Sequence, residues 1–133
     1  MTKIYYDHDA DISLLDGKRI GIIGYGNQGR AQALNMRDSG IKDILIATAK
    51  DETYDQAVKD DFQLTDIFAI TKQTDILFLL IPDELMPGVY EEYIAPHLRP
   101  GMVLNFASGY NITFRQIVPP GDVDVIMVAP RMI

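Results

Sequence analysis

The chain has 133 residues, of which 47% are hydrophobic, and a formal net charge of −7. This length corresponds to a single domain, and the composition suffices for one buried core. No cysteine occurs, which excludes disulfide frameworks, thiolate zinc sites and cysteine nucleophiles. The twelve Lys and Arg residues are scattered, which argues against a nucleic-acid surface. The longest apolar run, Ile76 to Ile81, is far too short to span a bilayer, and the N-terminus has no apolar signal core. We therefore expect a cytoplasmic protein without a membrane partner.

The order of elements predicts an α/β fold. A polar, acidic arm over residues 1–17 comes first and ends in a turn at Asp16-Gly17. Apolar runs then predict buried strands at 19–24, 43–47, 75–81, 102–106 and 124–129, with a short strand at 62–64. Helical spacing predicts helices at 28–39, 54–61, 65–73 and within 84–98, where Pro87 restricts the start. Apolar strands separated by helices indicate a doubly wound parallel sheet, a Rossmann fold, in one domain over 1–133.

A glycine-rich loop follows the first predicted strand and opens the first predicted helix. It reads Gly24-Tyr25-Gly26-Asn27-Gln28-Gly29. In this setting the first glycine allows a tight turn, the second lets the backbone approach a pyrophosphate, and the third lets the helix pack close to the strand. The helix N-terminus adds unpaired N–H groups and a partial positive charge. We expect these six residues to bind a nicotinamide dinucleotide.

Several segments together resemble the ketol-acid reductoisomerase family. They include Lys3 to Asp7, the glycine loop, Ala33 to Gly40, Pro82-Asp83-Glu84 and Ile117 to Pro130, so the likeness runs through nearly the whole chain. The resemblance implies the NAD(P)-binding domain of an oxidoreductase of branched-chain amino-acid synthesis, which couples an alkyl shift on magnesium to reduction by NADPH. In that family a second, helical domain carries the acidic magnesium ligands, and it is absent from this chain. We therefore expect no metal site here, magnesium only if a second domain exists, and no catalysis by this chain alone.

The chain departs from the family pattern at several positions, Ser108 and Arg131 among them. Ser108 stands where the family has a histidine important for catalysis, in the segment Phe106 to Thr113. A serine hydroxyl is a poor acid or base without an activating partner, although it can hydrogen-bond a substrate oxygen or the nicotinamide amide. The alternative is that Ser108 is simply a small residue tolerated in a turn before Gly109. Arg131 replaces a family lysine, and we assign it no catalytic role.

The loop after the second strand carries acids where the family carries an arginine and serines for the 2′-phosphate of NADPH. By ungapped comparison, Thr48, Asp51 and Thr53 occupy those positions. A carboxylate repels a 2′-phosphate but accepts hydrogen bonds from the ribose hydroxyls of NAD, and Asp51 lies 22 residues after Gly29, near the usual spacing for the ribose-binding acid. Lys50 could reach a phosphate. The cofactor is NAD or NADP, and we favour NAD.

A third group follows the strand at 75–81, at the end where open α/β sheets place their ligands. By resemblance, Asp83, Glu84, Leu85 and Met86, together with Pro82, lie along the cofactor near the nicotinamide. The alternative for Asp83 is a cap on the following helix. We interpret the pair Asp60-Asp61 as a solvated helix face.

Three functions remain open at this point. The first is the cofactor domain of an enzyme similar to ketol-acid reductoisomerase. The second is a dinucleotide-binding module that has lost the chemistry, as the change at Ser108 suggests. The third is a keto-acid reductase without the isomerase step. A homo-oligomer is also left open.

Overall fold

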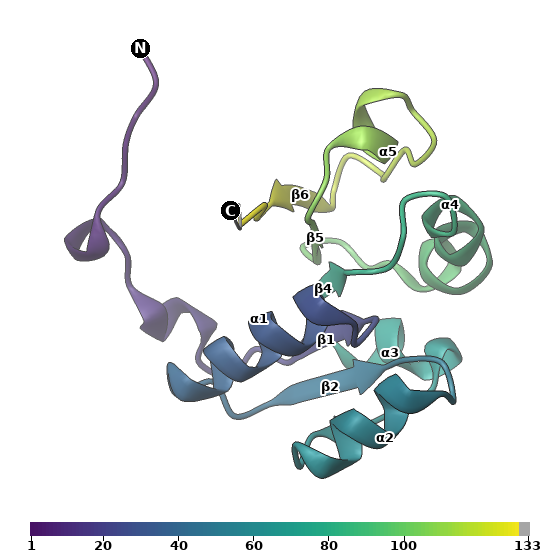
Figure 1. Ribbon diagram of the computed structural model, residues 1–133. Coiled ribbons are helices and arrows are strands. Elements are labelled where there is room, and N and C mark those ends of the chain that lie inside the picture. The colour runs from purple at the N-terminus through teal and green to yellow at the C-terminus, as the bar shows by residue number, and fades with distance from the viewer. Residues whose placement is uncertain (131–133) are drawn as a thin grey trace.

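Six strands form one parallel sheet in the computed structural model, which describes residues 1–130 (Figure 1). The strand order is β3-β2-β1-β4-β5-β6, and every neighbouring pair is parallel. The strands are β1 Ile20–Ile23, β2 Ile44–Ala47, β3 Gln63–Leu64, β4 Ile76–Leu79, β5 Val103–Phe106 and β6 Asp124–Met127. All six predicted strands are therefore confirmed, with ends that differ by a few residues.

The two halves of the sheet diverge at β1. This strand pairs with β2 on one side and with β4 on the other, with Ile20 level with both Ile44 and Ile76. The chain leaves β1 toward one half and leaves β4 toward the other. A crevice therefore opens at the carboxyl ends of these two strands, where doubly wound folds bind ligands. The predicted fold class is confirmed.

Helices cover both faces of the sheet (Figure 1). They are α1 Asn27–Asp38, α2 Glu52–Lys59, α3 Ile67–Gln73, α4 Met86–Val89 and α5 Tyr110–Thr113. α4 continues into a π-helical turn, η3 Tyr90–Ile94, and a 3₁₀ turn, η4 Ala95–His97. The predicted helix within 84–98 is thus present but irregular, and Pro87 sits in its first turn, where a missing N–H is tolerated. Among the α-helices of residues 1–130, α5 alone is not expected from the sequence, because four residues carry no helical period.

Two buried clusters flank the sheet because its strand side chains alternate between faces. One cluster packs Ile20, Ile22, Ile44 and Ile46 against α1 and α2 through the small side chains Ala33 and Ala57. The other packs Leu77, Leu79, Leu104 and Phe106 against α3, α4 and η3 through Ile70, Met86 and Ile94. These clusters hold the carboxyl ends of β1, β2 and β4 in place.

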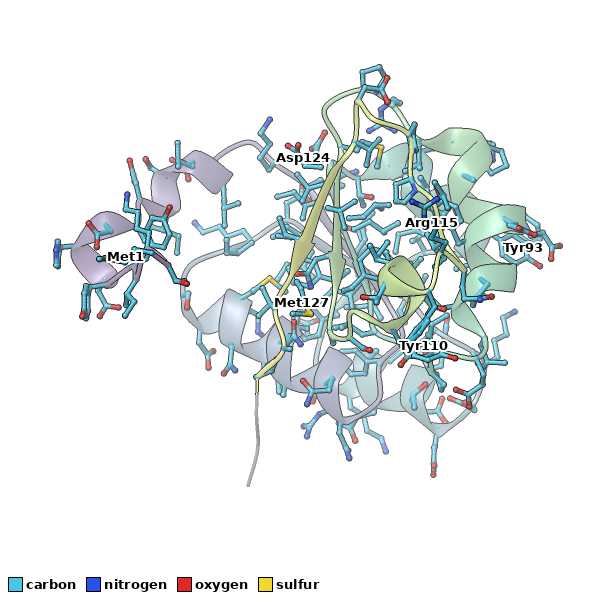
Figure 2. All side chains as sticks on the ribbon, turned by 90° about the horizontal axis from the view of Figure 1, so that it is seen from above. Met1, Tyr93, Tyr110, Arg115, Asp124 and Met127 are labelled. Carbon is cyan, nitrogen blue, oxygen red and sulfur yellow. The ribbon has the colours of Figure 1, made fainter. Side chains whose placement is uncertain are left out.

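Two parts of the chain are less covered than the rest, the N-terminal arm and the edge strand β6. The arm over residues 1–17 contains two 3₁₀ turns, η1 Asp7–Asp9 and η2 Ile12–Leu15, and extends away from the sheet (Figure 1). It also carries exposed apolar side chains, among them Ile4, Tyr5 and Leu14. The four residues of β6, at one edge of the sheet, are also exposed, and Figure 2 shows Asp124 and Met127 at opposite ends of that strand. Arg131 lies outside the described residues.

Candidate functional site

The first and third glycines of the loop are required by the backbone around them. Gly24 has φ +97°, and a Cβ at this position would collide with the carbonyl oxygen of Leu80 on the neighbouring β4 side. A Cβ at Gly29 would collide with the carbonyl oxygen of Gly24, and this close approach brings α1 against the end of β1. A side chain at either position would therefore push the turn away from the sheet, as the sequence predicts.

The second glycine differs from both. Gly26 has ordinary dihedrals, φ −73° and ψ −161°, and a Cβ there would meet no atom within 4 Å. It is the N-cap of the twelve-residue helix α1 and contributes no side-chain cap. The space beside Gly26 is therefore open at the start of α1, where the first N–H groups have no partner within the helix and the helix adds a partial positive charge. The loop thus presents an open cradle suited to an anion.

A cleft of about 830 Å³ lies beside this cradle, within the range of ligand pockets. Three loops line it, those that follow β1, β2 and β4, together with the start of α3 and one face of α4 and η3. Its apolar wall consists of Ile23, Leu64, Ile67, Leu80, Ile81, Leu85, Val89 and Tyr93. The cleft can therefore accept a flat apolar ring system beside an anionic group.

The polar end of the cleft brings together the three residues predicted to choose the cofactor. Asp51 caps α2, since its Oδ1 accepts from the Thr53 N–H at 2.8 Å and from the Thr53 hydroxyl at 2.6 Å. The hydroxyls of Thr48 and Thr53 lie 2.7 Å apart. Hydrogen bonding from Thr53 lowers the pKa of Asp51, which is therefore ionised at neutral pH. Lys50 also lines the cleft.

The residues after β4 divide between different environments. Pro82 and Leu85 line the main cleft, whereas Asp83 and Glu84 line a separate cavity of about 420 Å³ beside Asn111. Met86 is buried in the core and lines neither cavity. The idea that Asp83 caps the next helix is wrong, because the N-cap of α4 is Leu85 and it has no side-chain cap. The Asp83 carbonyl instead accepts from the Asn111 side chain at 3.1 Å.

Ser108 and Tyr25 have structural contacts of their own. The Ser108 oxygen accepts from the Tyr110 N–H at 3.2 Å and thereby stabilises the start of α5. Ser108 does not line the main cleft. The Tyr25 side chain is only 2% exposed, so this residue can face a ligand through its backbone alone. Asn27, Gln28 and Gly29 occupy the first turn of α1, as predicted.

Part of the cleft was missed by the sequence interpretation. Leu64, Ile67 and Tyr93 form much of its apolar wall, yet they come from β3, α3 and the π-helical turn η3. The local signal in the sequence is that Leu64 ends a strand and Ile67 comes shortly after it. Tyr93 reaches the cleft from η3, and π-helical turns occur often at functional sites.

Two further findings concern the part of the chain that the structure describes. Within residues 1–130, no group of three or more His, Asp or Glu side chains gathers where it could hold a metal ion. No helix among these residues is both long and apolar enough to cross a bilayer.

Comparison with known proteins assigns the chain to a family. The family model "Acetohydroxy acid isomeroreductase, NADPH-binding domain" matches residues 14–133. The chain is 48% identical to a ketol-acid reductoisomerase (NADP(+)) of Pyrococcus abyssi and 50% identical to one of Pyrobaculum arsenaticum, each over 98% of the chain. It spans 40% of the length of both relatives.

Solved structures give the same result. An NADH-preferring ketol-acid reductoisomerase from an uncultured archean superposes with a TM-score of 0.92 at 42% identity, over 98% of this chain and 41% of that one. A semialdehyde dehydrogenase NAD-binding protein from Cupriavidus necator shares the fold alone, with a TM-score of 0.66 at 20% identity over 82% of this chain and 40% of that one. The strand order, the glycine loop and these matches agree: the chain belongs to the acetohydroxy acid isomeroreductase NADPH-binding domain family, a family of dinucleotide-binding Rossmann domains.

Proposed function

We propose that the main cleft binds NAD(H) in preference to NADP(H). The pyrophosphate lies on the cradle at Gly26, and the adenosine ribose lies beside Asp51. The observation that carries this proposal is the direction of the hydrogen bonds around Asp51. A carboxylate can only accept, so the Thr53 hydroxyl must donate its single proton to Asp51. The Thr48 hydroxyl then donates to Thr53.

This arrangement suits a ribose hydroxyl and opposes a phosphate. The Thr48 hydroxyl proton points to Thr53 and the Thr53 hydroxyl proton points to Asp51, so neither proton is free to bind the oxygens of a 2′-phosphate. Oδ2 of Asp51 takes neither bond from Thr53, since both go to Oδ1. It can accept a hydrogen bond from a ribose 2′-hydroxyl, whereas a 2′-phosphate would bring like charge against the carboxylate. Lys50 offers one opposing cation at the same end.

The relatives do not decide the cofactor, because two are named for NADP(+) and one is described as NADH-preferring. The discriminating feature must therefore come from this chain's own loop. Asp51 is the residue we assign to that choice, with Thr48 and Thr53 holding it in place.

The chain's residues bind and orient the cofactor rather than perform the chemistry. The apolar wall around Leu64, Ile67 and Tyr93 takes the adenine ring, and Pro82 and Leu85 extend the cleft along β4 toward the nicotinamide. NADH, when bound, would supply a hydride. Ser108 keeps its hydroxyl proton, which can be donated to a substrate oxygen or to the nicotinamide amide.

We further propose that the whole protein is an oxidoreductase that reduces a 2-keto acid derived from a 2-acetolactate; the support is its similarity to relatives named ketol-acid reductoisomerase. This chain spans 40% of the length of those relatives, and we propose that a part of the protein outside it supplies the metal and most substrate contacts. The 133-residue chain alone should therefore show no turnover of 2-acetolactate with NADH and magnesium. Turnover by this chain would overturn that expectation.

One observation favours a second candidate, a dinucleotide-binding module without catalysis or a reductase without the isomerase step. No acid or base contacts the Ser108 oxygen within the described residues, so nothing there activates it. A full-length protein that reduces a 2-keto acid but does not isomerise 2-acetolactate would favour the reductase.

Calorimetric titration with NADH and with NADPH tests the cofactor proposal. We expect NADH to bind more tightly to the native chain, and Asp51→Ser to lower this preference. Asp43→Asn is the matched control, because Asp43 pairs with Arg19 at the opposite end of the sheet. Tighter binding of NADPH by the native chain would refute the assignment of Asp51.

A further inference from the structure

Asp60 joins the phosphate loop to helix α2. It is the C-cap of α2, and both of its carboxylate oxygens are occupied. Oδ2 accepts from the Tyr25 hydroxyl at 2.9 Å and from Arg30 Nε at 2.7 Å. Oδ1 accepts from Gln56 at 3.0 Å and from Arg30 Nη2 at 3.2 Å. The interpretation of Asp60 as part of a solvated helix face is therefore wrong, since its side chain is only 13% exposed.

A second layer of contacts strengthens the same junction. Arg37, in the last turn of α1, donates to the Asp60 carbonyl and lies over the Phe62 ring at 4.4 Å. The Tyr25 ring meets the edge of Phe62 at 5.9 Å. Both ends of α1 and the middle of the phosphate loop are thereby attached to the residues that end α2. None of Asp60, Phe62 or Arg37 lines the cleft.

The other end of α2 reaches the cofactor-choosing residues. The helix has eight residues and begins directly after its cap Asp51. A short regular helix transmits the position of one end to the other, because its backbone bonds leave little freedom. The phosphate loop and Asp51 are therefore held at a set separation through α2, with Asp60 as the link.

We propose that Asp60 is a positioning residue for dinucleotide binding, which sets the backbone of Tyr25 and the start of α2 at the separation that the pyrophosphate and ribose require. This inference rests on the proposed function. Asp60 acts through Tyr25, Arg30 and Gln56 and does not touch the ligand. A residue of this kind pre-organises the site and so lowers the cost of ordering it on binding.

The charge state of the junction is constant over the useful pH range. Hydrogen bonding from Arg30 lowers the pKa of Asp60 to about 2, with further contributions from Tyr25 and Gln56. Burial raises the pKa of Tyr25, assisted by its hydrogen bond to Asp60. A carboxylate acceptor and a neutral phenol donor therefore persist at neutral pH. The link does not act as a pH switch between pH 5 and pH 9.

The test compares NADH binding by the native chain, Asp60→Asn, Tyr25→Phe and the control Asp43→Asn, all well below their melting temperatures. We expect the Kd for NADH to rise about tenfold in Asp60→Asn and about threefold in Tyr25→Phe, and to change less than about twofold in Asp43→Asn. The double variant Tyr25→Phe/Asp60→Asn should bind no more weakly than Asp60→Asn alone, because both act through one link.

A purely structural role predicts a different result. It lowers the melting temperature of Asp60→Asn but leaves the Kd for NADH unchanged in the folded chain. The amide resonances of Gly26 and Thr53 give an independent readout, since the inference predicts that both move in Asp60→Asn. Should Asp60→Asn not fold, Tyr25→Phe decides, because it removes one hydroxyl from an otherwise intact ring.

The outcomes separate the two proposals. A native chain that does not bind NADH refutes the proposed function, whatever the variants do. A native chain that binds NADH, with Tyr25→Phe and Asp60→Asn binding it equally well, refutes only the positioning role of Asp60.

Discussion

Substitutions at Gly26 and Gly29 of the phosphate loop should have different effects, because the two glycines lie in different surroundings. Gly26→Ala places a methyl group in open space, so the fold should tolerate it. Loss of a good N-cap costs about 1 kcal/mol, and the lower entropy of the unfolded chain returns about 0.4–1 kcal/mol. The net change in the free energy of unfolding should stay within about 1 kcal/mol, or about 4 °C in melting temperature.

NADH binding, in contrast to stability, should be clearly weakened by Gly26→Ala. The methyl group of Gly26→Ala projects toward the pyrophosphate, and overpacking of this kind costs about 1–3 kcal/mol, which is about five- to 150-fold in Kd. Gly26→Val should weaken binding further.

Gly29→Ala supplies the matched comparison. Its Cβ collides with the Gly24 carbonyl, so the turn must shift and the free energy of unfolding should fall by about 2 kcal/mol or more. Thermal denaturation by circular dichroism and titration with NADH measure the two effects separately. Equal NADH affinity in Gly26→Val and the native chain would refute the placement of the pyrophosphate. An unchanged melting temperature in Gly29→Ala would refute the close packing of α1.

Three other predictions follow from particular contacts. Asp51→Arg should reverse the cofactor preference by putting a cation beside the ribose, and NADPH titration that shows no gain in affinity contradicts this. The pKa of Asp60 is lowered to about 2, so its contribution to stability is complete above the unfolded pKa near 3.9 and is lost as the pH falls toward 2. In Asp60→Asn the free energy of unfolding should therefore depend less on pH between pH 4 and pH 2. The same pH dependence in the variant and the native chain would count against the junction. Asn105 is fully buried in β5, and neither its amide oxygen nor its amide nitrogen is hydrogen-bonded within residues 1–130. Asn105→Leu should therefore raise the free energy of unfolding, measured by urea denaturation, by about 1–2 kcal/mol. A loss of stability would argue against an unpaired amide.

Local patterns in the sequence predict much of the fold. Ile20–Ile23 and Ile76–Leu79 are apolar on both faces because both faces of the sheet are covered, and this pattern is visible without the structure. The glycine loop is equally local, since turn, cradle and helix start occupy six consecutive residues. Family resemblance adds the cofactor-choosing positions, and the structure brings Thr48, Asp51 and Thr53 together at one end of the cleft.

Contacts between distant residues account for what was missed. Asp60 looks like a surface acid in a pair, because its partners Tyr25 and Arg30 precede it by 35 and 30 residues. Tyr25 looks like a ligand contact from its place in the loop, yet its ring is buried against Phe62. Asp83 resembles a helix cap, but the N-cap of α4 is Leu85, and the Asn111 side chain donates to the Asp83 carbonyl instead. None of these pairings can be recognised from the local periodicity of the sequence.

Titration of the isotopically labelled chain with NADH, followed through its amide resonances, shows directly whether the cleft binds the dinucleotide. We expect saturable shifts at Gly26, Asp51 and Thr53, which line the cleft, and at Asn27, the first residue of α1, and no shift at Gly40 or Gly101, which lie outside the cleft. Shifts confined to residues away from the cleft, or no shifts at saturating NADH, would contradict it.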